Sequence, residues 1–299
     1  MAKSISIVGA GRVARAVGRR LRQLGWTIDA VCARSETSAR KAVHYIGAGR
    51  ACSGLSARIL ASPVLLIAVP DDVIADVARE LARVAGPLLR GKIALHTSGA
   101  HNSGILAAIR NCGAYTASMH PLQTFSGADV PPFEGKVFAI DGDAAAVRAA
   151  RGMVRALGGV PVRIAPAKKI LYHAAGVFAA SHLLALEETA VQTMMLAGMK
   201  RKEAQRALLS LTRQTLEHYE KFGARKSWTG PLARRDFGTI AAHEEALQRA
   251  NPAFLAAYQS LSALAAGILL SADAASTRRE LDRISEALLP AQIVKGECA

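Results

Sequence analysis

The first half of the chain alternates between short apolar runs and longer stretches in which apolar residues recur every three or four positions. A short apolar run predicts a buried strand, and the longer period predicts a helix with one apolar face. The predicted strands are Ile5–Val8, Thr27–Cys32, Val64–Val69, Lys92–His96, Tyr115–Met119, Val137–Ile140 and Val160–Ile164. The predicted helices between them are a stretch ending near Gln23, then Glu36–Tyr45, Val73–Ala85, Ser103–Cys112 and Ala144–Leu157. This alternation predicts an α/β fold with a mostly parallel sheet covered on both faces.

The pattern changes at about Pro166, and no strand is predicted from Lys168 onward. The predicted helices there are Ile170–Ala197, Arg201–Phe222, Phe237–Arg249, Pro252–Ala272 and Ser276–Leu289. We therefore expect two domains: residues 1–165 with the sheet and residues 166–299 all-helical. A cleft between them, at the carboxyl ends of the strands, is the expected ligand site.

A glycine-rich turn follows the first strand. Gly9, Gly11 and Ala14 form a Gly-x-Gly-x-x-Ala pattern that opens a helix. In a dinucleotide-binding turn the first glycine permits the tight bend, the second lets the backbone approach a pyrophosphate, and a small third residue lets helix and strand pack closely. The free N–H groups of the helix then face the phosphates. The residues assigned to the cofactor in this turn are Gly9, Ala10, Gly11, Arg12 and Val13.

The end of the second strand indicates which dinucleotide binds. NAD-dependent domains usually place an acid there, whereas an arginine accommodates a 2′-phosphate. Asp29 falls inside the predicted strand, and the strand end carries Arg34 and Ser35, a guanidinium and a hydroxyl. NADP(H) is therefore the expected cofactor. The alternative is that Arg34 is only a solvated loop charge.

Composition narrows the class of protein. Of the 299 residues, 51% are hydrophobic and 20% are charged, which suits folded domains. No uninterrupted apolar run reaches the ~18 residues of a membrane span, so we expect a cytoplasmic protein without membrane association. The four cysteines lack disulfide or metal-ligand spacing, and we predict no metal site. The net charge of +15 raises the alternative of nucleic-acid binding, but the basic residues are scattered, so no specific nucleic-acid partner is expected.

Three later strand ends carry residues suited to ligand contacts. Val69 and Pro70 could form a wall beside a nicotinamide ring, and Ser98 with Gly99 could approach the cofactor or substrate. His120 could contact the substrate or act as an acid or base. A histidine at a strand end is about as often a structural hydrogen-bonding group, so this alternative stays open for His120 and for His96.

The start of the helical half carries a polar face. Lys169, Tyr172 and His173 lie at positions i, i+3 and i+4 and therefore share one side of a helix. Further on, Thr229, Arg234 and Asp236 combine a hydroxyl, a guanidinium and a carboxylate, which suits an anionic substrate. The alternative for this second segment is a capped helix start with a surface Arg–Asp pair.

Taken together, these segments resemble the Rossmann-like/DUF2520 family, which is related to the 6-phosphogluconate dehydrogenase-like, ketopantoate reductase-like and pyrroline-5-carboxylate reductase-like enzymes. The resemblance implies a helical second domain that often serves for dimerisation, so a homodimer through that domain is expected. It also implies that Lys169 and His173 match the Lys-x-x-x-Asn helix of related hydroxyacid dehydrogenases, with His in place of Asn. Arg235 stands where the family usually has glycine.

The resulting hypothesis is an NADP(H)-dependent oxidoreductase. A hydride would pass between the nicotinamide and a carbonyl or imine carbon of a small, anionic substrate, with Lys169 or His173 as the catalytic proton donor. Ser98, His120, Thr229, Arg234 and Asp236 are the predicted substrate-binding residues. The alternative is a sensor or scaffold that binds NADP(H) and catalyses nothing.

Overall fold

The structure, a computed structural model, describes residues 3–126, 130–269, 279 and 281–283. The chain divides into two compact units, residues 1–181 and 182–299. This division falls inside a helical run that continues from Pro166 to Leu196. The predicted domain boundary at residue 165 stays a prediction.

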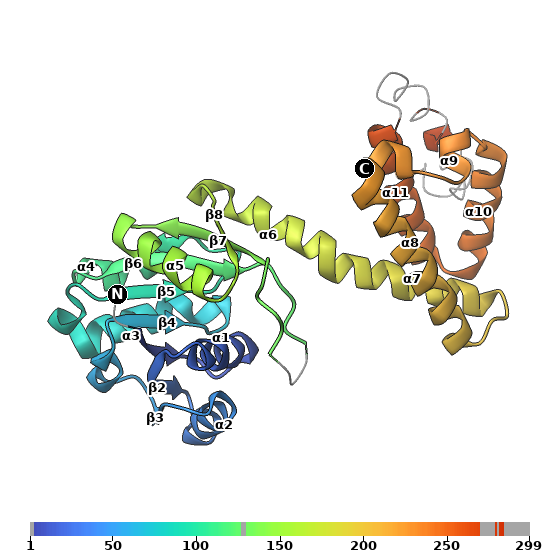
Figure 1. The fold of residues 1–299 in the computed structure, drawn as a ribbon. Helices are drawn as coiled ribbons and strands as arrows, with labels where there is room; N and C mark the ends of the chain where they lie inside the picture. The colour runs from blue at the N-terminus through green and yellow to red at the C-terminus, as the bar shows by residue number, and fades with distance from the viewer. Residues whose placement is uncertain (1–2, 127–129, 270–278, 280, 284–299) are drawn as a thin grey trace, which may run out of the picture. The chain divides into compact units, whose positions relative to one another are not determined.

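The first unit contains an eight-stranded sheet in the order β3-β2-β1-β4-β5-β6-β7-β8 (Figure 1). All neighbouring strands pair in parallel except β6 and β7, which confirms the mostly parallel sheet. The strands are β1 Ser4–Val8, β2 Thr27–Ala33, β3 Arg50–Ser53, β4 Val64–Ile67, β5 Ile93–His96, β6 Tyr115–Pro121, β7 Val137–Gly142 and β8 Val160–Arg163. Since the chain order reverses between β1 and β4, a ligand is expected beyond the carboxyl ends of these central strands.

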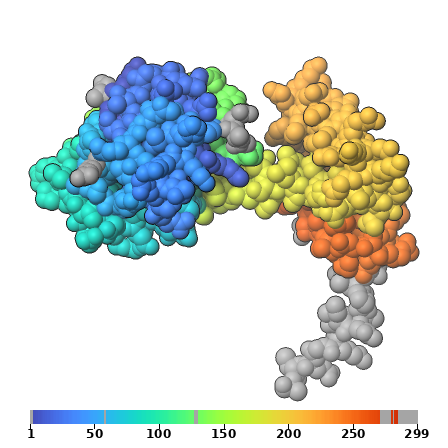
Figure 2. Space-filling model, turned by 90° about the horizontal axis from the view of Figure 1, so that it is seen from below, coloured from blue at the N-terminus to red at the C-terminus, as the bar shows by residue number. Residues whose placement is uncertain are grey.

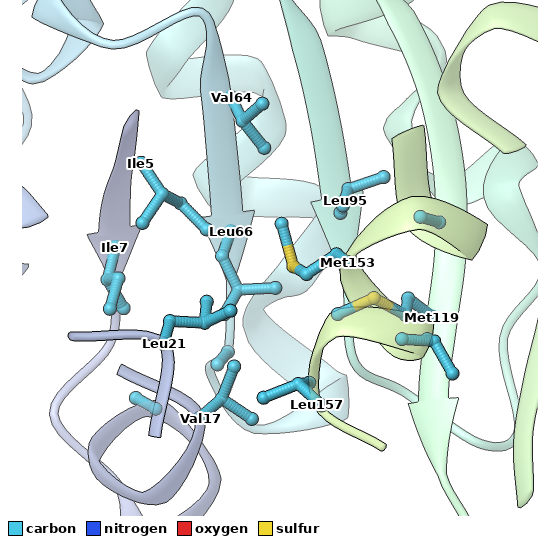
Figure 3. Close-up of a cluster of buried hydrophobic side chains, with 14 of the residues drawn as sticks. Ile5, Ile7, Val17, Leu21, Val64, Leu66, Leu95, Met119, Met153 and Leu157 are labelled. Atoms are coloured by element: carbon cyan, nitrogen blue, oxygen red, sulfur yellow. The ribbon is translucent and has the colours of Figure 1, made fainter. Parts of the chain in front are cut away.

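Helices cover both faces of this sheet. The helices of the first unit are α1 Arg12–Gln23, α2 Glu36–Ile46, α3 Ile74–Ala85, α4 Ala107–Asn111, α5 Ala144–Ala156 and α6 Lys169–Val177. On one face, Val17 of α1 and Met153 of α5 point into a buried cluster with Ile7, Leu66 and other strand residues (Figure 3). On the other face, α3 and α4 pack against the sheet through a second buried cluster. Apolar side chains on both sides of the central strands explain why their sequences are continuous apolar runs.

One strand was missed by the sequence analysis. β3 pairs in parallel with β2, and none of its four residues is fully buried. An edge strand of this kind lacks the apolar run that marks a buried strand. The short helix Pro231–Arg234 was not predicted either, and a π-helical turn at Phe178–His182 interrupts the predicted helix Ile170–Ala197.

The second unit is helical throughout its described residues, as predicted. Its helices are α7 Leu183–Leu196, α8 Arg201–Ser227, α9 Pro231–Arg234, α10 Phe237–Ala250 and α11 Pro252–Leu269. Leu232, Ile240 and Ala266 belong to its buried core. A π-helical turn, Phe178–His182, joins α6 to α7 within one helical run, and Gly223 kinks α8. The predicted helix Ser276–Leu289 lies largely outside the described residues.

Two helical runs, Pro166–Leu196 and Pro252–Leu269, are long and apolar enough to cross a membrane by length and composition. Polar residues such as His173 and Ser181 interrupt the first run, so no uninterrupted apolar run of that length was predicted. Core helices of water-soluble proteins meet the same criterion. The first run carries exposed apolar side chains, among them Leu171 and Leu184, which are 64% and 70% exposed. Helix α6 is visible at the surface in Figure 2.

Candidate active site

The glycine turn after β1 forms a cradle at the carboxyl edge of the sheet. Gly9 has φ +122°, and a Cβ there would lie 2.1 Å from the carbonyl oxygen of Ala68, so only glycine fits. Gly11 is the N-cap of α1, and a Cβ built on it would meet no atom within 4 Å. Ala14 is fully buried against the sheet. In the described chain no side chain caps α1, so its first N–H groups are open to an anionic ligand.

The other residues assigned to this turn lie around the cradle. Ala10 and Val13 pack partly against the core, and Arg12 is the exposed first residue of α1. The first turn of α1 contains no acidic residue, so its positive dipole end is not neutralised by its own side chains. The cradle therefore suits a phosphate group.

Arg34 and Ser35 follow β2 on the same edge. The hydroxyl of Ser35 accepts a hydrogen bond from the backbone N–H of Ser38 at 3.3 Å and so caps α2. Arg34 is exposed. The capping role of Ser35 anchors the loop, and the ligand contact predicted for Arg34 stays a prediction.

Val69, Pro70 and Ser98 occupy the edge beyond β4 and β5. Ser98 is buried, and its hydroxyl donates to the Asp71 carboxylate at 2.8 Å and accepts from the backbone N–H of His101 at 3.0 Å. This hydroxyl is engaged within the protein, while Pro70 is exposed and Val69 half-buried. The ligand contacts predicted for these three residues stay predictions.

His96 proves to be a structural group. Its side chain is fully buried, its Nε2 donates to the carbonyl oxygen of Asn102 at 3.2 Å, and its Nδ1 accepts from the backbone N–H of Ser98 at 3.2 Å. Burial, aided by the positive charge of Lys169, lowers the pKa of His96 to about 3. The ring is therefore neutral at pH 7 and holds the loop after β5.

The Lys169 side chain is almost fully buried. Its ammonium group is 1% exposed, hydrogen-bonds the carbonyl oxygen of Ser98 at 3.1 Å and the hydroxyl of Ser118, and pairs with the Asp141 carboxylate at 3.4 Å. Burial lowers the pKa of Lys169, and Asp141 opposes that shift. Two protein oxygens thus accept hydrogen bonds from the ammonium group, and the Asp141 carboxylate lies at ion-pair distance without a hydrogen bond to Oδ2.

Tyr172, His173 and His120 form the layer above Lys169. The Tyr172 hydroxyl lies 2.9 Å from Nδ1 of His120, and the His120 and His173 rings meet edge to face with centroids 6.0 Å apart. Both rings pack closely against Gly99, since a Cβ there would lie 2.6 Å from His173 and 2.8 Å from His120. The structure thus joins predicted residues of β6 and α6 around the backbone after β5.

Two members of this arrangement were not predicted as site residues. Tyr172 had a signal, because it shares the helix face of Lys169 and His173. Asp141 is a buried acid at the end of the apolar run Val137–Ile140, and such a group is rarely buried without a partner. Nothing in the local sequence indicated that its partner is Lys169.

The second unit holds the remaining predicted substrate residues. Asp236 caps α10 by accepting from the backbone N–H of Thr239 at 3.1 Å, as the alternative interpretation expected. Arg234 is the exposed last residue of α9. Thr229 lines an apolar cavity of about 640 Å³ within this unit, together with Trp228 and Tyr258 among others. Their contacts with a substrate stay a prediction.

Arg235 has φ 57°, the left-handed conformation, at the C-cap of α9. A glycine adopts this conformation without the steric cost that a Cβ brings. This conformation explains why glycine is usual at the position of Arg235 in the family that the sequence resembles.

Comparisons with known families support the resemblance seen in the sequence. Residues 2–121 match a family described as a Rossmann-like domain, and residues 136–265 match a domain of unknown function, DUF2520. The chain therefore carries a Rossmann-like domain followed by a DUF2520 domain. No curated protein matches the chain.

Several solved structures share the fold. A candidate NADP oxidoreductase from Bacteroides fragilis aligns with a TM-score of 0.70 and 20% identity, over 87% of this chain and 96% of that one. An imine reductase from Pseudomonas aligns with a TM-score of 0.65 and 18% identity, over 96% of this chain and 99% of that one. A reductive aminase from Aspergillus terreus, in complex with NADPH and ethyl-5-oxohexanoate, aligns with a TM-score of 0.62 and 17% identity. The alignment covers 96% of this chain and 95% of that one.

Proposed function

We propose that the protein is an NADP(H)-dependent oxidoreductase that reduces a carbonyl or imine carbon of a small substrate. The observation that carries this proposal is the presence of a phosphate cradle and a cluster of protonatable side chains on one edge of one sheet. The cradle follows β1, and the cluster lies at β5 and β6, two and three strand positions away. At a strand spacing of ~4.8 Å this is roughly 10–14 Å, which an extended dinucleotide can span.

The residues of the first unit fit such a cofactor. The open space at Gly11 and the uncapped start of α1 suit a pyrophosphate, and Arg34 suits a 2′-phosphate. Bound there, the reduced nicotinamide would supply a hydride, that is, a hydrogen with two electrons. The chain would orient the substrate and supply a proton at the oxygen or nitrogen of the reduced bond. The fold shared with an NADPH-bound reductive aminase supports this proposal.

Binding titration tests the cofactor. Isothermal calorimetry should show tighter binding of NADPH than of NADH. Gly11→Ala should weaken NADPH binding by about tenfold, since a methyl group enters the space meant for the pyrophosphate. Gly152→Ala is the matched control, because a Cβ at this α5 position also meets no atom within 4 Å. Absence of affinity for both nucleotides would overturn the proposal.

Turnover tests the reaction. Absorbance at the nicotinamide band should fall when glyoxylate, pyruvate or 1-pyrroline is added with NADPH. Tight NADPH binding without reduction of any 2-oxo acid or cyclic imine would favour the non-catalytic sensor or scaffold.

The dimer expected from the family resemblance is part of the same proposal. The helical run Pro166–Leu196 exposes Ile170, Leu171, Phe178 and Leu184, each at 61% or more. Large apolar side chains exposed along one helical run favour burial against a second copy of the chain.

A further inference from the structure

The proposed reaction needs a proton donor, and the geometry narrows the choice. The Lys169 side chain is 1% exposed, its ammonium group hydrogen-bonds Ser98 and Ser118, and it lies 3.4 Å from the Asp141 carboxylate. A substrate could reach its ammonium group only after the buried ion pair had opened, which would leave the Asp141 carboxylate buried without a partner. The donor must therefore come from the layer above Lys169.

Tyr172 has the geometry of a donor. It lies one helical turn from Lys169, is half-buried, and its hydroxyl hydrogen-bonds Nδ1 of His120 at 2.9 Å. The two rings meet nearly perpendicular, with an interplanar angle of 87°. Gly99 limits the space beside His120, so the imidazole is fixed between the Gly99 backbone and the phenol.

We propose that Tyr172 is the proton donor of this reductase and that His120 positions and supports its hydroxyl through an Nδ1–H···Oη hydrogen bond. This inference rests on the proposed function and differs from the sequence-based prediction, which named Lys169 or His173 as the donor. His120 acts through Tyr172 and is a positioning residue.

The step balances without any further reactant. As the hydride from the reduced nicotinamide adds to the substrate carbon with its electron pair, the Oη–H bond of Tyr172 breaks and a new O–H or N–H bond forms on the substrate. The phenolate left on Tyr172 accepts the Nδ1–H hydrogen bond of His120. A proton from solvent then restores the phenol, so the net change consumes one proton for each hydride transferred.

The protonation states agree with these roles. Burial raises the pKa of Tyr172 to about 12, so the phenol carries its proton at neutral pH. Burial, with Lys169 and His173, lowers the pKa of His120 to about 4, so its ring is neutral. Lys169, His173 and His96 interact electrostatically with His120, and Asp141 and Asp71 in turn interact with Lys169.

The first test needs neither cofactor nor substrate. Long-range ¹H–¹⁵N spectra of the full-length protein at neutral pH distinguish the two neutral tautomers of each histidine, and His120→Asn assigns the His120 signals. We expect His120 to carry its proton on Nδ1, and Tyr172→Phe to shift the Nδ1 resonance. A proton on Nε2 would mean that Tyr172 donates to His120, and this would overturn the inference even if the protein is a reductase.

The second test is kinetic. With glyoxylate, pyruvate and 1-pyrroline as probes, Tyr172→Phe should lower kcat by about 100-fold while the Kd for NADPH holds. Tyr115→Phe is the matched control, since this exposed tyrosine begins β6 at the opposite edge of the sheet. His120→Asn keeps a side-chain N–H donor and should retain more activity than His120→Ala.

The pH profile separates Tyr172 from a histidine donor. With a 2-oxo acid as probe, kcat should stay level up to about pH 9, because a phenol keeps its proton there, whereas a histidine donor loses activity as pH rises through about 6.5. A fall through that lower range, or full activity of Tyr172→Phe, would overturn the inference. Failure to reduce any probe would count against the proposed function, and the tautomer of His120 would still decide the arrangement of the pair.

Discussion

Lys169 and Asp141 form an ion pair, Nζ to Oδ2 3.4 Å, in which both side chains are 1% exposed. Lys169 begins α6, and Asp141 lies in β7, so the pair fixes the start of the helix to the sheet. A second oxygen of Asp141 accepts from the backbone N–H of Ser103 at 2.8 Å. The pair thus joins three segments beneath the candidate active site.

Breaking this pair should destabilise the protein. Lys169→Met leaves a buried carboxylate without its cation and should lower the free energy of unfolding by roughly 3–5 kcal/mol. Urea denaturation followed by circular dichroism measures the change. Arg83→Met, which breaks an exposed pair with Glu80, should have no measurable effect. Equal stability of Lys169→Met and the unaltered protein would show that the pair does not hold the fold.

Stability should fall as the solution becomes acidic. The pKa values of His96 and His120 are lowered from 6.5 to about 3 and about 4 by burial and by Lys169. Below pH 6.5 the unfolded chain therefore binds protons that the folded chain does not, so stability is full above that value and declines as pH falls through about 4 to about 3.

Urea titrations across this range measure the decline. His120→Asn should make the slope of stability against pH shallower, because one of the two groups is gone. His218→Asn, at an exposed histidine of α8, should leave the slope unchanged. An unchanged slope in His120→Asn would contradict the lowered pKa assigned to His120.

Arg34 should decide the preference between the two nucleotides. Arg34→Ala removes the guanidinium at the end of β2 and should weaken NADPH binding by about tenfold or more without changing NADH binding. Calorimetric titration of both nucleotides measures this. Arg79→Ala, an exposed arginine of α3, is the control. A parallel loss for both nucleotides would mean that Arg34 acts on the shared part of the cofactor.

The left-handed backbone at Arg235 predicts that a glycine at this position stabilises the fold more than an alanine. Arg235→Gly and Arg235→Ala remove the same side chain, but only glycine accepts φ 57° without cost. The glycine variant should therefore be about 1–2 kcal/mol more stable than the alanine variant. Thermal and urea unfolding of the two proteins gives this difference, and equal stability would mean that the backbone relaxes at this position.

The apolar side chains exposed along the helical run Pro166–Leu196 predict a dimer. The protein should sediment as a dimer at micromolar concentration, and Leu184→Glu should dissociate it, because a charge would enter the buried interface. Leu88→Glu, at a leucine of similar exposure outside this helical run, should leave the dimer intact. A monomer in sedimentation of the unaltered protein would remove this part of the proposal.

Features that depend on neighbours in the chain were readable from the sequence. The Gly9–Ala14 turn could be predicted because backbone conformation and local packing decide it. The buried strand β4 could be predicted because helices cover both of its faces, so its sequence is continuously apolar. The edge strand β3 could not, since its side chains are partly exposed and carry no such signal.

The contacts of the candidate site depended on the tertiary structure. Sequence spacing placed Lys169, Tyr172 and His173 on one helix face, but it could not tell which of them lies beneath the site. The order of the strands brings Asp141 of β7 under Lys169 and His120 of β6 against Tyr172. A periodic pattern specifies which side of an element is buried, whereas the partner of each polar group follows from how distant segments pack.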